Sequence, residues 1–422
     1  MNLIFKKKKI ACSFNDFSNN QFNKFLKELN KKNEITLFTS EKIAKKIFKN
    51  NFKIFFLDSD KNYLYNFLKK FSKTKKSSLQ DYYFIEKIIF SNLLKKFFYL
   101  TKFILNKLGI LIDINYLRRI LIKKKVFKKK FDFLITDFRS NDIYSNHQVI
   151  NNAKKLKIPI VVILFSWDNL YSQDVNLDAD IFFVGSIKLR ELLSERHKIS
   201  LDKIFTFKSF QFSYLDKKVK KEKTDDYILY SCCVEQESEI AKEEIKIINY
   251  IADFLLKHNY KTKLYVRPYP FLKNKNNLNL KFNYPNIFVK EYGKKIIRRK
   301  INNINEFMRY EMSSDSKLKI LKNAICNINF LSTIGLESVL LKKNTIFLNI
   351  KKKVNNANVI EFFKSNYFKS RFLDHYRIFE KNKFFVTDMK KLERKLFKVL
   401  DQRGKKYNIR QYKFIKNFFL KQ

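Results

Sequence analysis

Cysteine, glycine, proline and tryptophan are all scarce: the 422-residue chain has four cysteines, five glycines, four prolines and one tryptophan. The cysteines, Cys12, Cys232, Cys233 and Cys326, show no C-x-x-C spacing, and a disulfide between the adjacent pair would be strained. The sequence therefore argues against structural zinc and favours a reducing, cytoplasmic compartment.

Long uncharged apolar runs are also missing. No stretch approaches the roughly 20 apolar residues of a membrane-spanning helix. Met1–Phe5 are followed by four lysines, whereas a secretory signal carries its charges before a longer apolar run. These absences favour a cytoplasmic protein, and they leave peripheral association with the inner face of a membrane open.

Acidic residues are few relative to basic ones, 40 against 89, which gives a formal net charge of +49. Lysine, asparagine, isoleucine and phenylalanine are abundant together while glycine, proline and tryptophan are scarce, which is the composition that an AT-rich genome produces. A basic surface for an anionic membrane or nucleic acid is the alternative. Nucleic-acid binding is the least favoured function, because no recognition motif is visible and the lysines are spread over the whole chain.

Short apolar runs that end in polar residues organise the first half of the chain. The central run, Ile158–Phe165, is typical of a strand buried on both faces of a parallel sheet, and it ends in Ser166–Leu170. Phe133–Thr136 and Asp180–Val184 repeat the pattern. Polar residues at such strand ends fall where open α/β sheets bind ligands.

Helical and strand-like segments alternate along both halves, which predicts βαβ units with parallel strands. We expect an N-terminal Rossmann-like domain over residues 1–215, a charged linker over 216–226 and a C-terminal Rossmann-like domain over 227–390. The C-terminal helices of residues 391–422 are expected to cross back to the N-terminal domain. Residues 82–125 combine apolar and basic residues at helical spacing, and they either lie on an anionic bilayer or cover the N-terminal sheet.

A strand-to-helix turn in the second half carries the clearest chemistry. Cys326–Phe330 is predicted as a strand that breaks into Ser332, Thr333 and Gly335 before a helix that contains Glu337. Hydroxyls and free backbone N–H groups at such a turn form an anion site, and the helix dipole adds to it. An ordinary capped helix is the alternative explanation of this pattern.

The order of several motifs resembles GT-B-fold surface-polysaccharide proteins, which are related to the CDP-glycerol glycerophosphotransferases and the UDP-N-acetylglucosamine 2-epimerases. The residues that carry the resemblance are Trp167–Leu170, Asp180, Gly185-Ser186, His197–Ile199, Lys203–Phe205, Arg267–Pro270, Ser332–Glu337 and Arg371–Phe379. The resemblance implies an α/β protein of two Rossmann-like, doubly wound parallel-sheet domains that face each other across a cleft.

The chain departs from the pattern of this family at two places. Lys208–Phe212 stands where the family carries a glycine-containing turn, and Tyr269 replaces the histidine of an Arg-Pro-His-Pro motif. Arg267 is retained. A non-catalytic or degenerate member is one alternative to a transferase, and it would explain both departures. A nucleotide-sugar epimerase is another alternative because it shares the fold, but Tyr269 stands where its histidine is expected.

The resemblance implies transfer of a glycosyl or alditol-phosphate group from a nucleotide sugar or CDP-alditol to a glycan or lipid-linked acceptor. Implied donor-binding residues are Arg267 for the diphosphate, Ser332, Thr333 and Gly335 for the phosphates, Glu337 for the ribose, and Ser231 and His375 nearby. Candidates for the general base are Asp168, Asp137 and His147. No metal ion and no cofactor are expected.

Overall fold

The computed structural model describes residues 7–14, 17, 20–40, 42–48, 52–57, 101, 104–105, 108–109, 126–127, 131–137, 144–165, 179–197, 199–210, 212–216, 226–232, 239–267, 284–289, 315–330, 332–349, 381–402 and 407–420. They form two compact units. Unit 1 extends to Tyr214 and includes the end of the last helix from Phe418, and unit 2 extends from Leu215 to Asn417.

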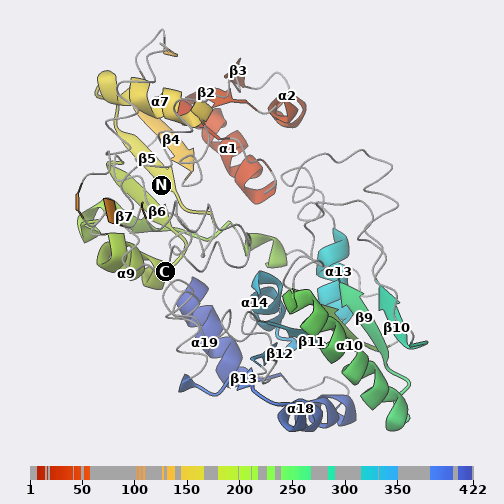
Figure 1. Ribbon diagram of the computed structural model, residues 1–422. Coiled ribbons are helices and arrows are strands. Elements are labelled where there is room, and N and C mark those ends of the chain that lie inside the picture. The colour runs from red at the N-terminus through yellow and green to blue at the C-terminus, as the bar shows by residue number, and fades with distance from the viewer. Residues whose placement is uncertain are drawn as a thin grey trace. The chain divides into compact units, whose positions relative to one another are not determined.

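Unit 1 is built on a seven-stranded sheet in the order β3-β2-β1-β4-β5-β6-β7, in which every neighbouring pair is parallel (Figure 1). The strands are β1 (Lys9–Ser13), β2 (Glu34–Thr39), β3 (Lys53–Phe56), β4 (Phe133–Asp137), β5 (Ile160–Ile163), β6 (Ile181–Val184) and β7 (Ile204–Thr206). The helices are α1 (Asn20–Lys32), α2 (Ile43–Phe48), α7 (Tyr144–Lys155) and α9 (Ile187–His197).

Helix α1 covers one face of this sheet because its apolar residues recur at helical spacing. Phe22 and Leu26 are buried in one cluster with Ile10 and Cys12 of β1. Phe22 also contacts Phe165, which follows β5, at 4.5 Å between ring centroids. The aromatic core of unit 1 therefore extends to the carboxyl ends of its strands.

Unit 2 is built on a six-stranded parallel sheet in the order β10-β9-β8-β11-β12-β13. The strands are β8 (Tyr227–Ser231), β9 (Lys263–Arg267), β10 (Ile287–Val289), β11 (Cys326–Asn329), β12 (Asn344–Leu348) and β13 (Phe385–Val386). The helices are α10 (Glu239–Lys257), α13 (Asp315–Asn323), α14 (Thr333–Leu340), α18 (Met389–Asp401) and α19 (Ile409–Leu420) (Figure 1).

Helices cover both faces of the second sheet. One face packs Ile228, Ile328 and Ile346 against apolar residues of α10 and α18. The other face packs Tyr227 and Leu229 with Leu321 of α13 and Ile334 of α14. Successive strand residues point to opposite faces, so alternate positions along β8 and β11 belong to different helix layers.

The predicted α/β fold with two doubly wound parallel sheets is confirmed. In both sheets the strand order reverses once, between β1 and β4 and between β8 and β11. Ligands of open α/β sheets bind at the carboxyl ends of the strands next to such a reversal. That the two sheets face each other across a cleft stays a prediction.

Several predicted segments lie wholly or largely outside the described residues, among them the basic helices of residues 82–125 and the linker at 216–226. At the end of the chain, Phe419 of α19 contacts Phe212 at 5.9 Å between ring centroids. Among the helices that the structure describes, none is both long and apolar enough to span a bilayer.

Candidate functional site

Polar residues gather at the carboxyl end of the unit 2 sheet, at its strand-order reversal. The register places Arg267 of β9 beside Ser231 of β8, and Asn329 of β11 beside Phe347 of β12. Because Ile328 is paired with Tyr230, Asn329 comes next to Ser231 in the same register. All four residues therefore lie on one level of the sheet, on the face that α13 and α14 cover.

Hydrogen bonds tie this level to the strand positions below it. The Ser231 hydroxyl donates to Asn327 Oδ1 at 3.0 Å, and Asn327 Nδ2 donates to the Ile334 carbonyl in α14 at 3.4 Å. Ser231, Asn327 and Asn329 are fully buried. Polar side chains thus hold two neighbouring strands and the start of α14 together. An apolar core would be enough if this region had only to be stable.

The turn into α14 is shaped by Asn329. Its Oδ1 accepts hydrogen bonds from the Ser332 backbone N–H at 3.1 Å and from the Ser332 hydroxyl at 3.2 Å. Ser332 is the residue before the helix, and its side chain makes no capping bond to the helix N–H groups. The first turn of α14 therefore lacks the side-chain cap that an ordinary helix start would carry.

Gly335 packs directly against Asn329. A Cβ atom at this position would lie 2.4 Å from Asn329 Oδ1 and 2.6 Å from Phe347 Cε1, both shorter than van der Waals contact. Glycine is required here because the first turn of α14 approaches the side chains of Asn329 and Phe347 so closely.

Glu337 is 1% exposed and forms an ion pair with Lys317 of α13. The lysine Nζ lies 2.7 Å from Glu337 Oε2 and 2.9 Å from Oε1, and the lysine side chain is 11% exposed. The pair links the first turn of α13 to the middle of α14. A bond from Glu337 to a ribose stays a prediction.

Arg267 is 5% exposed at the end of β9. The charge of Arg267 acts on Cys232, the residue after β8. Burial raises the pKa of the Cys232 thiol well above its usual range, the Glu244 carboxylate raises it further, and the positive charge of Arg267 lowers it. A guanidinium cation therefore lies at the carboxyl end of β9, where the sequence predicted it.

Of the candidate general bases, Asp137 is the one whose side chain the structure describes. It ends β4, which is one of the two strands at the reversal of the unit 1 sheet, and it is 3% exposed beside Ile163 in the register. His147 lies in α7, with its side chain outside the described part. Asp168 and His375 lie outside the described residues.

Sequence reasoning missed four polar residues of unit 2, namely Asn327, Asn329, Asn349 and Lys317. The signal for the first two was present, since asparagine at alternate positions of Cys326–Asn329 puts two amides on one face of a strand with apolar neighbours. Nothing in the sequence pairs Lys317 with Glu337. Among the residues described, no group of three or more His, Cys, Asp or Glu side chains is arranged to hold a metal ion.

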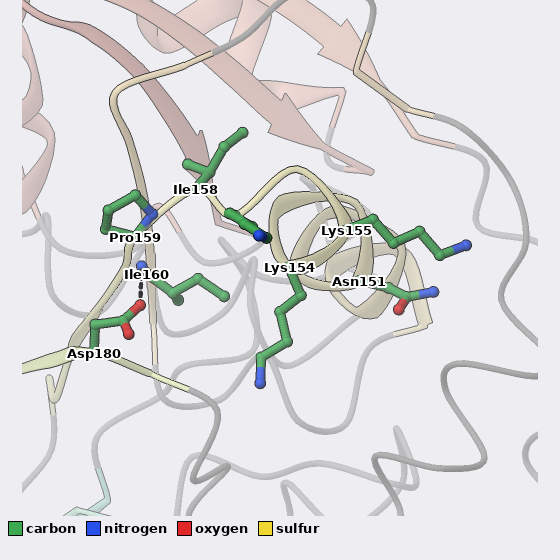
Figure 2. A pocket seen from close by; sticks show the side chains of 8 residues that line it. Asn151, Lys154, Lys155, Ile158, Pro159, Ile160 and Asp180 are labelled. Carbon is green, nitrogen blue, oxygen red and sulfur yellow. Dashed lines mark hydrogen bonds between the residues drawn. The ribbon is translucent and has the colours of Figure 1, made fainter.

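A cavity of about 590 Å³ lies in unit 1, away from these strand ends. Its lining includes Lys154, Lys155, Pro159 and Asp180, at the amino end of β5 (Figure 2). Asp180 accepts a hydrogen bond from the Ile160 N–H at 2.8 Å, and the two lysines point in different directions. The cavity lies at the opposite end of β5 from the predicted ligand site, and these lysines do not converge on an anion.

Comparison with known proteins supports the fold. No family model and no curated protein match the chain. A crystal structure assigned as a UDP-N-acetylglucosamine 2-epimerase of Listeria monocytogenes aligns with 98% of this chain and 92% of its own, at a TM-score of 0.51 and 11% identity. The UDP-GlcNAc 2-epimerase of Methanocaldococcus jannaschii aligns with 93% of this chain and 92% of its own, at 0.45 and 15%.

The wall teichoic acid polymerase TagF aligns with 99% of this chain and 85% of its own, at a TM-score of 0.42 and 10% identity. Identities this low show the fold alone, and the Listeria structure is the one of these three whose TM-score carries that conclusion. The chain has the GT-B fold. Its two doubly wound sheets are the seven-stranded sheet of unit 1 and the six-stranded sheet of unit 2.

Proposed function

We propose that the protein transfers a glycosyl or alditol-phosphate group from a nucleotide-activated donor to a glycan or lipid-linked acceptor. The observation that carries the proposal is a set of buried polar residues at the carboxyl end of the unit 2 sheet, which we call the polar level of unit 2. Ser231, Arg267 and Asn329 lie there beside a helix start without a side-chain cap, at the strand-order reversal. Ligands of open α/β sheets bind at such a position.

In this proposal the donor diphosphate binds at the N-terminus of α14. Backbone N–H groups and the positive end of the helix dipole attract an anion there, with Ser332 and Thr333 at the turn. Arg267 pairs with the diphosphate, because a guanidinium offers two parallel donors and neutralises the charge of the leaving group.

Glu337 accepts hydrogen bonds from the ribose hydroxyls in this proposal. Lys317 holds both carboxylate oxygens at 2.7 and 2.9 Å, which fixes the orientation of the side chain before the donor arrives. A carboxylate has about four acceptor sites, so the ion pair leaves capacity for hydroxyl donors.

Asp137, Asp168 and His147 are the proposed candidates for the general base. The base takes the proton of the acceptor hydroxyl as its oxygen attacks. In glycosyl transfer the oxygen bonds to the anomeric carbon and a nucleoside diphosphate leaves. In alditol-phosphate transfer it bonds to phosphorus and a nucleoside monophosphate leaves. The nucleotide released therefore identifies the reaction.

The test is to incubate the protein with UDP-sugars and CDP-glycerol, with and without a membrane extract as the source of acceptor, and to quantify the nucleotide released. Acceptor-dependent release that Asp137→Asn reduces by about 10²- to 10⁴-fold supports the proposal. Interconversion of a UDP-sugar without acceptor would instead identify an epimerase.

A further inference from the structure

Asn349, the residue after β12, carries a buried amide side chain. It is 2% exposed, and among the described residues neither its Oδ1 nor its Nδ2 has a hydrogen-bond partner. A buried polar group without a partner lowers stability because it has left water and gained nothing in return. Such groups are rare in native proteins and call for an explanation.

Asn349 belongs to the same face as the polar level of unit 2. Its backbone N–H donates to the Val386 carbonyl at 2.8 Å, so the chain still follows the sheet at this residue. Strand residues alternate between faces, which puts Asn349 on the face of Phe347. Phe347 is the register neighbour of Asn329, so Asn349 lies one step further toward the carboxyl edge.

Asn329 adds a second amide of this kind. Its Oδ1 holds Ser332, but its fully buried Nδ2 has no partner within the described part of the chain. Asn327, on the same face and equally buried, differs because both of its polar atoms are bonded, to Ser231 and to Ile334. Of these three amides, the deeper one, Asn327, is therefore satisfied, whereas the two nearer the strand ends each keep at least one atom without a partner among the described residues.

We infer that Asn349 is a specificity-determining residue of the donor site; the inference rests on the proposed function. A carboxamide presents a donor beside an acceptor, so it pairs with a ligand group that offers an acceptor beside a donor. The polar edge of a nucleobase and the adjacent hydroxyls of the transferred group both have this property. Phosphate has only acceptors and would leave Oδ1 unpaired, so Asn349 recognises the uncharged parts of the donor.

The first test is stability. Asn349→Leu replaces an unpaired amide with an apolar side chain of similar size, so the melting temperature of the unliganded protein should rise. The matched control is Asn327→Leu, which leaves the Ser231 hydroxyl and the Ile334 carbonyl without their partner and should lower the melting temperature. A loss of stability in Asn349→Leu comparable with that in Asn327→Leu would overturn the inference, because it would show a structural role.

The second test is affinity, measured by calorimetry with UDP, UDP-N-acetylglucosamine, CDP and CDP-glycerol. Loss of two neutral hydrogen bonds should weaken binding by Asn349→Leu about tenfold. Weakening for nucleoside diphosphates and complete donors alike identifies the base as the group recognised. Weakening for complete donors alone identifies the transferred group.

Two further outcomes separate this inference from the proposal on which it rests. If the unaltered protein binds these ligands and Asn349→Leu binds them equally well, the inference fails and the proposed function stands. If the unaltered protein binds none of the four, the proposed function fails and the inference with it.

Discussion

At the scale of the residue, the approach of Gly335 to Asn329 controls how α14 begins. Alanine at position 335 would place its Cβ 2.4 Å from the buried Asn329 amide and 2.6 Å from the Phe347 ring, so that at least one of these groups would have to shift. We expect Gly335→Ala to destabilise the protein by about 1–3 kcal/mol, the usual range for overpacking. Urea unfolding measures this loss.

Gly185→Ala is the matched control for that substitution. Its added Cβ would meet Ser209 Cβ at 3.0 Å and Ser209 Oγ at 3.2 Å, contacts that a shift of a few tenths of an ångström relieves. It should therefore cost less than Gly335→Ala. Equal losses would mean that the turn into α14 is less tightly packed than described.

A second prediction at this scale concerns the ion pair of Lys317 and Glu337. Removing one partner leaves a buried charge, so Lys317→Met should cost about 3–5 kcal/mol. The double variant Lys317→Met/Glu337→Leu should recover most of that loss, because it leaves no charge behind. The exposed pair of Lys31 and Glu28 is the control, and Lys31→Met should cost about 0–1 kcal/mol. Additive losses in the double variant would contradict a buried pair.

The sequence allowed Ser332, Gly335 and Glu337 to be singled out because the turn has a local pattern. It did not reveal that Ser332 turns toward Asn329, or that Glu337 pairs with Lys317 20 residues earlier. Such partners depend on how separate helices pack, which no local pattern encodes.

At the scale of the element, α18 gives a prediction that depends on pH. Asp388 caps this helix, since its Oδ1 accepts from the Lys391 N–H at 2.8 Å. This bond, with further help from the Lys391 side chain, lowers the pKa of Asp388 below its ordinary range. The cap therefore stabilises the folded state above the pKa of the unfolded chain, and the contribution is lost as pH falls through the lowered folded-state pKa.

Asp388→Ala should accordingly lower the melting temperature at neutral pH and have little effect in strong acid. Asp202→Ala is the comparison. The pKa of Asp202 is also lowered, but the largest cause is a hydrogen bond from the Ser200 hydroxyl and not one from a helix N–H. Melting curves of the variants across the acidic range give the answer. A difference that stays constant as the pH falls would show that the carboxylate does not act through its charge.

Most elements could be predicted because short apolar runs end abruptly in polar residues. The run Phe133–Thr136 gives β4 to within one residue, and Cys326–Phe330 gives β11 to within one residue. The predicted run Ile158–Phe165 extends beyond β5, in which Ile160–Ile163 pair with Leu134–Asp137 of β4. Register with a neighbour decides where a strand ends, and a single sequence does not show it.

At the scale of the whole molecule, the fold followed from alternation of strands and helices, while the function depends on ligands that no periodicity specifies. The net charge of +49 gives a prediction at this scale. If it serves membrane association, replacing Lys95, Lys96 and Lys102 by glutamate should abolish sedimentation with vesicles rich in anionic lipid, since each basic residue near such a surface contributes about 1 kcal/mol. The control replaces Lys390, Lys391 and Lys398 of α18. Equal sedimentation of all three proteins would contradict a membrane role for residues 82–125.

The most direct test of the donor site in unit 2 is calorimetric titration of the unaltered protein, Arg267→Ala and Arg394→Ala with UDP, CDP and their sugar or glycerol conjugates. Arg394 is an exposed arginine of α18 and serves as the control. We predict base-selective binding that Arg394→Ala retains and that Arg267→Ala weakens by about tenfold or more, because a charge-assisted hydrogen bond contributes about 1.5–3 kcal/mol. Binding that Arg267→Ala leaves unchanged, or no binding of any nucleotide by the folded protein, would contradict a donor site at this strand end.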